Sequence, residues 1–376
     1  MTAVKKVLVV GGGCAGTCAA IQLRKAGVAV DLVEQSADWG SYGAGISIGG
    51  ASLRALAAVG VLSEVLRLGQ GTDGVEIYAP HGLLLASMPT PRLAGGAVPG
   101  SAGIMRPVLA AILAEATRRS GTTVRLGTTF RSIEQTADNV QVTFTDGPAA
   151  SYDLVVGADG LHSATRKVVL PEAPTPKYTG QAVWRAVLRR PAEVKRARMY
   201  MGPRTKVGFN PVSADEMYLF VTEERPTNER VPPEQFEPLL SALLAPFPAG
   251  VIQTARAALG SPGARIVYRP LEGLLVPLPW YRGRVVLIGD AVHATTPHLA
   301  AGAGIGIEDA IVLAEEIARG ASVTGALEAF QARRWERCRM VVENSGRLGE
   351  IEATGGSQEE HGRIMQESLV ALAMPI

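Results

Sequence analysis

The sequence predicts an α/β protein in which a Rossmann-like domain is interrupted by a second, mainly antiparallel sheet domain. A β-branched run at residues 7–10 is followed at once by closely spaced glycines, as where a buried strand leads into a helix. Residues 174–268 alternate apolar and polar positions between Pro-rich turns. Strand–helix patterning returns after residue 271, so the first domain is discontinuous. We assign 1–72, 97–173 and 271–376 to it, and 73–96 and 174–270 to the sheet domain.

The first motif predicts a site for a phosphate-containing ligand. After the strand at 7–10, the chain follows the G-x-G-x-x-G spacing with Gly11, Gly13 and Gly16. Gly11 permits the tight turn, Gly13 allows a pyrophosphate to approach bare backbone, and Gly16 allows the next helix to pack closely on the strand. The helix then directs its free N–H groups and its positive end at the phosphates.

The second strand narrows the choice of dinucleotide. Gly27 ends the helix, residues 28–33 read as the next strand, and Glu34 follows it directly. A carboxylate there can accept both hydroxyls of a ribose, whereas it would repel a 2′-phosphate. The adenosine therefore belongs to NAD or FAD rather than NADP.

The remaining elements follow in order along the chain. Residues 41–68 resume helical patterning after a glycine-rich loop, "GSYGAGISIGG", and a helix is predicted at 106–119 with Leu109, Ile112, Leu113 and Ala116 on one face. Two short strands are expected within 72–90, three more at 122–127, 130–135 and 140–145, a helix near 234–247, and mostly helix over the last 60 residues.

Composition excludes several classes of function. Charged residues make up 19% of the chain and the net charge is +2, so nothing indicates a nucleic-acid partner. No apolar run reaches about 18 residues, and the first strand begins too early for a signal peptide, so we expect no membrane span and a cytoplasmic protein. Cys14, Cys18 and Cys338 show no metal-ligand pattern, and the first two are small packing residues rather than redox partners.

Two later motifs repeat the pattern of a buried strand followed by a Gly/Asp turn. "DLVVGADGLHSATR" at 153–166 contains Asp159 and Gly160. "RVVLIGDAVHATTPHLAAGAGIGIEDA" at 284–310 contains Gly289 and Asp290, with a helix expected to start at about Gly304. Each motif is common alone, but the three are specific together in this order and spacing.

With the fingerprint through Glu34 and the run Glu308, Asp309 and Ala310, these motifs resemble the class A flavoprotein monooxygenases of the p-hydroxybenzoate hydroxylase type, which include salicylate and 6-hydroxynicotinate hydroxylases. The resemblance covers nearly the whole chain. It implies FAD, with Glu34 on its ribose, Arg106 beside the pyrophosphate and Asp290 on the ribityl chain. The expected cofactor-binding residues are Gly11, Gly13, Gly16, Glu34, Gly45, Arg106, Asp159, Gly160, Gly289, Asp290, Gly302, Ala303 and Gly304.

The resemblance also gives roles to two of these motifs. Asp159 would serve both FAD and NAD(P)H binding. Reduced flavin carries negative charge near N1, which suits free N–H groups at the helix start formed by Gly302, Ala303 and Gly304. The family commonly has Gly-Gln-Gly where this chain has Ala300, Ala301 and Gly302, so the flavin contact departs from the family there.

Candidate catalytic residues lie on a loop and on a strand. His293 and His298 flank Pro297 on the loop that should cover the flavin ring; His293 either braces this loop or acts in catalysis, His298 is expected to meet the substrate, and Pro297 would offer its carbonyl. No carboxylate or Cys stands at ligand spacing with the two histidines, so no metal is expected. Tyr218 shares a strand face with Phe220 and Thr222, as a substrate contact or as a half-buried structural residue.

A neighbouring strand carries Trp184 and Arg185. This Arg either pairs with a substrate carboxylate or lies solvated at a sheet edge.

The resulting functional hypothesis is a monooxygenase, acting as a monomer or homodimer. NADH or NADPH would reduce FAD, O2 would add at C4a, and the hydroperoxyflavin would transfer its distal oxygen to a small aromatic or heteroaromatic ring, with Tyr218 or His298 as the base. One alternative is a halogenase or reductase of related fold, although "VWRAVL" does not supply the Trp-x-Trp-x-Ile-Pro halogenase signature. Another is an FAD-binding module without activity, which would not require a second domain.

Overall fold

The computed structural model describes residues 4–40 and 43–376, and its central feature is a six-stranded sheet in the order β18-β19-β12-β1-β2-β8. The pairs from β19 to β8 are all parallel, and β18 joins the edge antiparallel. The predicted β-branched run is buried because both faces of this sheet are covered. The strands are β1 (Lys6–Val10), β2 (Ala29–Glu34), β8 (Thr123–Leu126), β12 (Leu154–Gly157), β18 (Tyr281–Arg282) and β19 (Val285–Leu287).

The two faces of this sheet are covered differently. One carries helices α1 (Cys14–Lys25), α4 (Arg106–Arg119) and α9 (Gly302–Arg319), whose apolar residues share one cluster with Val7, Val9 and Val156. The other is covered by a small antiparallel sheet of β9 (Phe130–Gln135), β10 (Val140–Phe144) and β11 (Ala150–Tyr152), whose Phe130 and Val142 pack with Leu8 and Val155. The helix at 106–119 and the strands β9 and β10 lie where the sequence predicts them, whereas β11 was not predicted.

The second large sheet has seven strands, in the order β17-β13-β16-β15-β14-β5-β6. One of its faces is covered by η1 (Pro233–Gln235), α6 (Phe236–Leu244) and α7 (Gly250–Ala257), with Met217, Leu219 and Val221 in the shared core. Tyr218 therefore points to the opposite face, as the alternation predicts. The strands are β5 (Val75–Tyr78), β6 (Leu84–Met88), β13 (Lys177–Arg189), β14 (Ala197–Met201), β15 (Lys206–Pro211), β16 (Glu216–Glu224) and β17 (Arg265–Gly273).

The glycine-rich segment is not simply a loop, which corrects the sequence-based expectation. Residues 45–49 form β3 (Gly45–Gly49), which pairs antiparallel with β7 (Ser101–Met105), and β4 (Gln70–Thr72) pairs with the other side of β7. The partner strand lies far along the chain, so no local pattern reveals the pairing. Residues 41 and 42 of this segment lie outside the described residues. The helices α2 (Gly50–Val59) and α3 (Leu62–Leu68) follow.

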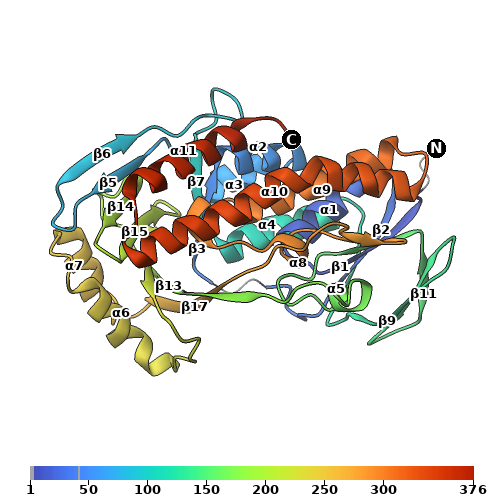
Figure 1. Ribbon diagram of the computed structural model, residues 1–376, viewed down its shortest axis with the longest axis horizontal. Helices are drawn as coiled ribbons and strands as arrows, with labels where there is room; N and C mark the ends of the chain where they lie inside the picture. The colour runs from blue at the N-terminus through green and yellow to red at the C-terminus, as the bar shows by residue number, and fades with distance from the viewer. Residues whose placement is uncertain (1–3, 41–42) are drawn as a thin grey trace.

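The C-terminal helices join the two sheet systems. The helix α10 (Val323–Thr354) runs along much of the molecule in Figure 1, and its end reaches β15, where Lys206 meets Glu352. The helix α11 (Gln358–Ala373) returns along it, and Arg54 and Arg337 donate to its last carbonyls, as suits cations at a helix C-terminus. The short elements α5 (Ala164–Val169), α8 (Asp290–His293) and η2 (Pro297–Leu299) follow the strand ends. Across the described residues, no helix is both long and apolar enough for a membrane span.

Candidate active site

The start of α1 is built around the three motif glycines. Gly11 has a φ of 105°, and a Cβ there would lie 2.4 Å from the carbonyl oxygen of Ala158. A Cβ on Gly16 would lie 2.0 Å from the oxygen of Gly11. Around Gly13, in contrast, no described atom lies within 4 Å of a built Cβ. The open side of the turn thus faces the N-terminus of a 12-residue helix, which suits a phosphate.

Glu34 is held in place at the end of β2. Its two carboxylate oxygens accept the backbone N–H groups of Gly12 and Ser36, each at 2.8 Å. Trp39 Nε1 donates to the Gly12 oxygen at 3.0 Å, so the glycine turn and the carboxylate are fixed to each other. Each oxygen has a second lone pair, which leaves acceptor capacity for ribose hydroxyls.

Gly289, Asp290 and Arg106 lie around the same helix start. Gly289 has a φ of 62°, and a Cβ there would be 2.8 Å from the Cβ of Ala15 in α1. Burial raises the pKa of the Cys14 thiol, and Arg106 and Asp290 act on it with opposite signs, so both side chains lie near this thiol. The structure therefore brings the first and third motifs together, and the backbone N–H of Arg106 donates to the Ala44 carbonyl of the glycine-rich segment at 3.1 Å.

Asp159 binds the residues at the start of α5. Its carboxylate accepts Ser163 Oγ at 2.5 Å and the backbone N–H and Oγ1 of Thr165 at 2.9 and 3.0 Å, so it ties down the start of α5. Arg166 donates to the carbonyls of Ala291 and Leu161 at 2.7 and 2.8 Å. The second motif is thereby locked to the third.

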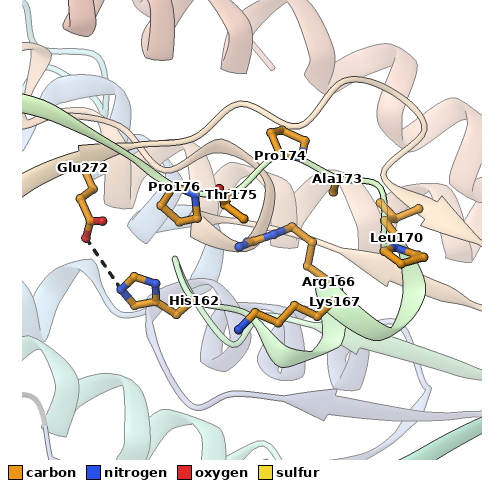
Figure 2. A pocket seen from close by; sticks show the side chains of 10 residues that line it. His162, Arg166, Lys167, Leu170, Ala173, Pro174, Thr175, Pro176 and Glu272 are labelled. Atoms are coloured by element: carbon orange, nitrogen blue, oxygen red, sulfur yellow. Dashed lines mark ion pairs between the residues drawn. The ribbon is translucent and has the colours of Figure 1, made fainter.

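A cavity of about 350 Å³ lies beside α5. Figure 2 shows His162 and Lys167 on one side of it and Glu272, at the end of β17, on the other. His162 Nε2 is 3.8 Å from Glu272 Oε2, and the His162 side chain is 73% exposed. This cavity borders both sheet systems.

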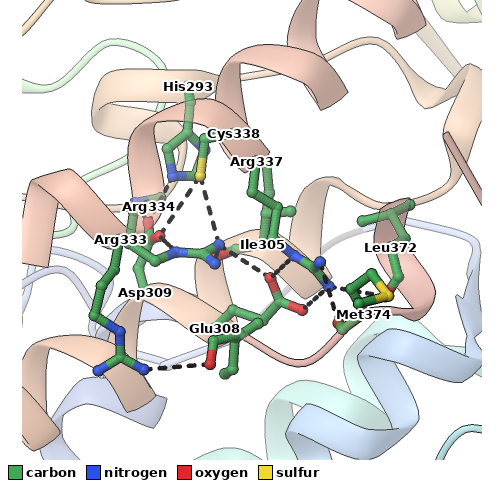
Figure 3. A network of polar contacts seen from close by, with 12 residues as sticks. His293, Ile305, Glu308, Asp309, Arg333, Arg334, Arg337, Cys338, Leu372 and Met374 are labelled. Atoms are coloured by element: carbon green, nitrogen blue, oxygen red, sulfur yellow. Dashed lines mark hydrogen bonds and ion pairs between the residues drawn. The ribbon is translucent and has the colours of Figure 1, made fainter. Parts of the chain in front are cut away.

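Behind the third motif lies a fully buried polar cluster (Figure 3). Asp309 accepts the Gly289 N–H at 2.9 Å, pairs with His293 Nε2 at 2.5 Å and accepts Arg334 Nε at 2.8 Å. Burial opposes ionisation of Asp309, but His293 and Arg334 hold its pKa at about 2. Burial likewise opposes charge on His293, yet Cys338 and Asp309 raise its pKa well above the ordinary value.

This cluster shows the positions of His293, Asp309 and Cys338, which no sequence pattern connects. His293 is directed at Asp309, which favours the bracing role over catalysis. Cys338 and Asp309 do gather near His293, within 4.8 Å, although their spacing along the chain gave no sign of it. Because the Arg334 guanidinium already donates to Asp309 inside the same group, we assign the cluster as an ion-pair network rather than a metal site.

His298 is oriented toward α10. Its Nδ1 lies 3.0 Å from Thr296 Oγ1 and its Nε2 lies 3.5 Å from Glu352 Oε2. A Cβ on Gly349 would be 2.7 Å from the imidazole Cε1. Burial lowers the pKa of His298 to about 4, so the ring is neutral at pH 7. Both ring nitrogens thus face protein groups, which weakens the interpretation of His298 as the base.

Tyr218 faces the glycine-rich strand β3. Its Oη lies 2.6 Å from Ser47 Oγ, and Gly45 makes room for the ring, since a Cβ there would be 2.2 Å from Tyr218 Cδ1. Burial raises the pKa of Tyr218, so it is a neutral phenol at pH 7. Gly45 therefore acts in this structure as a close-packing glycine beneath the candidate substrate residue.

Arg185 lies on the same sheet face as Tyr218. Burial and the nearby charge of Arg106 lower its pKa to about 10, with Arg269 adding to the effect. Among the described residues, no carboxylate forms an ion pair with Arg106, Arg185 or Arg269, whereas most other arginines are paired. Arg185 thus has two cationic neighbours, Arg106 and Arg269, and no ion-pair partner among the described residues.

Comparison with known proteins decides the family. A family model described as an FAD binding domain matches residues 5–345. The chain belongs to this family. It is 35% identical to the 2-heptyl-3-hydroxy-4(1H)-quinolone synthase of Pseudomonas aeruginosa over 92% of this chain and 90% of that protein, and 32% identical to the aurachin C monooxygenase/isomerase of Stigmatella aurantiaca over 92% and 89%. The solved structure of Klebsiella pneumoniae HpxO complexed with FAD and uric acid is 26% identical, with a TM-score of 0.82 over 98% and 92% of the two chains.

The class A flavoprotein monooxygenase assignment, its α/β fold and its FAD cofactor are thereby confirmed. The halogenase, reductase and inactive-module alternatives find no support in the names of these relatives, which are a quinolone synthase, a monooxygenase/isomerase and, in Klebsiella pneumoniae, an FAD-dependent urate hydroxylase. The open cradle at Gly13, the anchored carboxylate of Glu34 and the unpaired cation of Arg106 fit the ribose and phosphates of such a cofactor. The individual site residues remain predictions.

Sequence reasoning missed the side chains that support this site from a distance. Arg334, Glu352 and Lys206 have no motif around them, because each acts through a contact with a residue far along the chain. A faint signal exists on α10, where Arg334, Cys338, Val341, Ser345, Leu348 and Ile351 repeat at helical spacing and are buried. A buried Arg within such an apolar stripe indicates a carboxylate partner.

Proposed function

We propose that this monooxygenase hydroxylates a small heteroaromatic compound that binds as an anion, using NADH or NADPH and O2. The substrate would lie between the Tyr218 face of the seven-stranded sheet and the loop carrying Pro297. This position is supported by the packing of Tyr218 on β3, beside Met105, whose neighbour Arg106 begins α4. The seven-stranded sheet meets the small sheet of β3, β4 and β7 there.

The observation that carries this proposal is the unpaired charge of Arg185. Arg185 is half-buried, and a largely desolvated cation without a carboxylate carries a cost that is offset when an anionic group binds beside it. Arg106 and Arg269 lower its pKa further, which means that the site as a whole favours negative charge. The flavin phosphates can neutralise Arg106, and an anionic substrate can neutralise Arg185.

An anionic ring is also the form that suits hydroxylation. When bound, FAD carries electrons from the reduced nicotinamide to O2 and delivers one oxygen atom to the substrate. Loss of a ring O–H or N–H proton raises the electron density of the attacked carbon, and Arg185 favours that ionised form by lowering the substrate's pKa. Tyr218 would then orient the ring through its hydroxyl, which Ser47 holds in place.

The relatives favour a particular substrate class. The quinolone synthase of Pseudomonas aeruginosa is 35% identical to this chain, whereas the FAD-dependent urate hydroxylase of Klebsiella pneumoniae is 28% identical. A 4-quinolone has an N–H group conjugated with its carbonyl, so the ring can ionise and become electron-rich at carbon 3. We therefore place 4(1H)-quinolones first among the candidates, ahead of purines, hydroxypyridines and hydroxybenzoates.

For the reductant, we propose the cavity beside α5. Lys167 offers positive charge there, His162 offers ring nitrogens for hydrogen bonds, and Arg166, which lines the cavity, donates to the Ala291 carbonyl beside Asp290. We expect Lys167→Ala to raise the apparent Kd for NADH or NADPH without changing FAD retention. Unchanged reductant affinity in this variant would remove the cavity from the proposal.

The test of the main proposal is a screen with purified FAD-loaded protein. Oxidation of NADH and of NADPH is followed with 4-quinolones, urate, hydroxypyridines and hydroxybenzoates, together with O2 consumption and product mass. The proposal requires one candidate to yield a product heavier by one oxygen atom, and it requires Arg185→Met to bind that candidate more weakly while retaining FAD. Absence of a hydroxylated product from every ionisable heteroaromatic, or full activity of Arg185→Met, would overturn it.

A further inference from the structure

The loop at residues 289–301, which we call the flavin loop, is held by two histidine–carboxylate contacts of unequal strength. At its start, His293 pairs with Asp309 at 2.5 Å, and Asp309 has Arg334 and the Gly289 N–H as further partners. All three side chains are fully buried. This end of the loop is fixed by three charge-assisted hydrogen bonds to Asp309, although His293 Nδ1 and Arg334 Nη1 have no hydrogen-bond partner among the described residues.

The contact at the other end is incomplete. His298 Nε2 and Glu352 Oε2 are 3.5 Å apart, and neither atom has a hydrogen-bond partner among the described residues. Both side chains are more than nine-tenths buried. An N–H···O bond would need an approach of roughly 0.6 Å. Because buried polar atoms are rarely left unpaired, a bond between these two atoms would form if the side chains moved this short distance.

Two other groups hold the second carboxylate oxygen of Glu352, the one that does not face His298. Lys206 Nζ donates to Glu352 Oε1 at 2.6 Å, and His361 Nε2 lies 3.0 Å from the same oxygen. Lys206 belongs to β15 of the seven-stranded sheet, Glu352 to α10 and His361 to α11. Gln181 of β13 also reaches this place, since a Cβ on Gly349 would lie 2.7 Å from its Oε1. One carboxylate therefore touches the sheet, the C-terminal helices and the flavin loop.

We propose that Glu352 is a positioning residue that couples the seven-stranded sheet to the flavin loop. While Glu352 is bound to Lys206, it makes no hydrogen bond to His298, so His298 and the adjoining Pro297 can shift. When Lys206 releases Glu352, the carboxylate accepts the N–H of His298 and fixes both loop residues. The structure presents the first arrangement. The role in substrate binding rests on the proposed function, because it takes the seven-stranded sheet as the substrate layer.

The two partners of Glu352 should then have opposite effects on the loop. Glu352→Gln removes the charge that attracts His298, so backbone hydrogen exchange in residues 294–301 should become about fivefold faster, at the low end of typical coupling strengths. Lys206→Met frees Glu352 for His298, so exchange in the same residues should become slower by a similar factor, although Lys206 does not contact the loop. General loosening of the fold would make exchange faster in both variants.

The experiment is hydrogen exchange read by mass spectrometry on FAD-loaded protein. In the double variant Lys206→Met with Glu352→Gln, no unpaired buried charge remains, and exchange should follow Glu352→Gln because the proposed effect of Lys206 on the loop requires the Glu352 carboxylate. The matched control is Glu360→Gln, which breaks the Arg347–Glu360 pair between the same two helices and should leave the loop unchanged. Faster or unchanged exchange in Lys206→Met, or a double variant that follows Lys206→Met, would overturn the proposal.

A second readout connects the coupling to catalysis. Product formed per reductant consumed should fall in Glu352→Gln, since a loosened loop admits water, and should hold in Lys206→Met. If the parent protein hydroxylates none of the candidates, the proposed function fails while the exchange result still decides the coupling.

Discussion

At the scale of single residues, Ala300 adopts a backbone conformation that favours glycine. Its φ is 50°, and it stands where the family commonly has the first Gly of Gly-Gln-Gly. A left-handed conformation costs a non-glycine residue about 1–2 kcal/mol, and part of this is regained by the lower chain entropy of Ala in the unfolded state. We expect Ala300→Gly to raise the free energy of unfolding by about 0.5–1 kcal/mol. Urea unfolding measures this, and Ala314→Gly inside α9 should instead lower stability by about 1 kcal/mol.

Glu34 is predicted to contribute to FAD affinity through its charge. Replacing it with Lys or Ala removes charged hydrogen bonds, so FAD binding should weaken by about 1–3 kcal/mol. Glu34→Gln keeps one acceptor and should lose less. Quenching of flavin fluorescence on titration into apoprotein gives the affinities. Equal affinity in all variants would mean that the ribose does not lie at the end of β2.

For Tyr218, the structure favours a positioning role over base catalysis. The phenol is neutral at pH 7 and bonded to Ser47, so Tyr218→Phe should lose about 1 kcal/mol of stability and keep its FAD. Hydroxylation should fall only a few-fold, with part of the reductant's electrons appearing as H2O2. A loss of about 10²-fold or more would instead identify Tyr218 as the proton acceptor. The measurement is product formed per NAD(P)H oxidised.

At the scale of elements, the contact of η2 with α10 gives the protein a defined dependence on pH. The pKa of His298 is lowered from its ordinary 6.5 to about 4 by burial, so the unfolded chain binds more protons between these values. Stability from this group is present above pH 6.5 and is lost as pH falls toward 4, by at most about 3 kcal/mol. His298→Gln should flatten the pH dependence of apoprotein stability over this window, as measured by urea unfolding at a series of pH values. An unchanged slope in His298→Gln would contradict the assignment.

Glu352 and Asp309 act in a lower pH window. Both carboxylates have pKa values held at about 2 by their cationic neighbours, so their contribution is complete above their ordinary values and is lost only in stronger acid. His293 has the opposite sign, because its raised pKa stabilises the fold below 6.5 and loses this effect as pH rises through the folded value. The stability maximum is therefore expected near neutral pH.

At the scale of the whole molecule, one non-covalent FAD per chain is expected, since the three motifs converge on a single helix start. Acid precipitation should release the flavin, and its absorbance measured against protein mass gives the ratio. Bound flavin that stays with the precipitated chain would indicate a covalent link, and a ratio near two would indicate a second site.

Most of the secondary structure could be predicted from local sequence patterns. The strand at β1, the helix from Arg106 to Arg119 and the alternation around Tyr218 could be predicted, because each is set by neighbouring residues. The strand β3 could not be predicted, because its glycine-rich sequence is typical of a loop and its partner strand lies more than 50 residues away along the chain. The structural roles of Asp309 and Glu352 could not be predicted for the same reason. Their ion-pair partners, Arg334 and Lys206, come close to them only in the folded chain.

The six-stranded sheet is built from segments far apart along the chain, and this sets an order of events during synthesis on the ribosome. Gly11 and Glu34 leave the ribosome early, but β12 and β19, the strands on one side of β1, come only after the middle and late parts of the chain have been made. Arg334, which completes the cluster behind Gly289, comes later still. The nascent chain must therefore keep an apolar half-sheet from aggregating while the second domain emerges and folds. Chaperone supply and translation speed, more than free FAD during elongation, should set the yield of active protein.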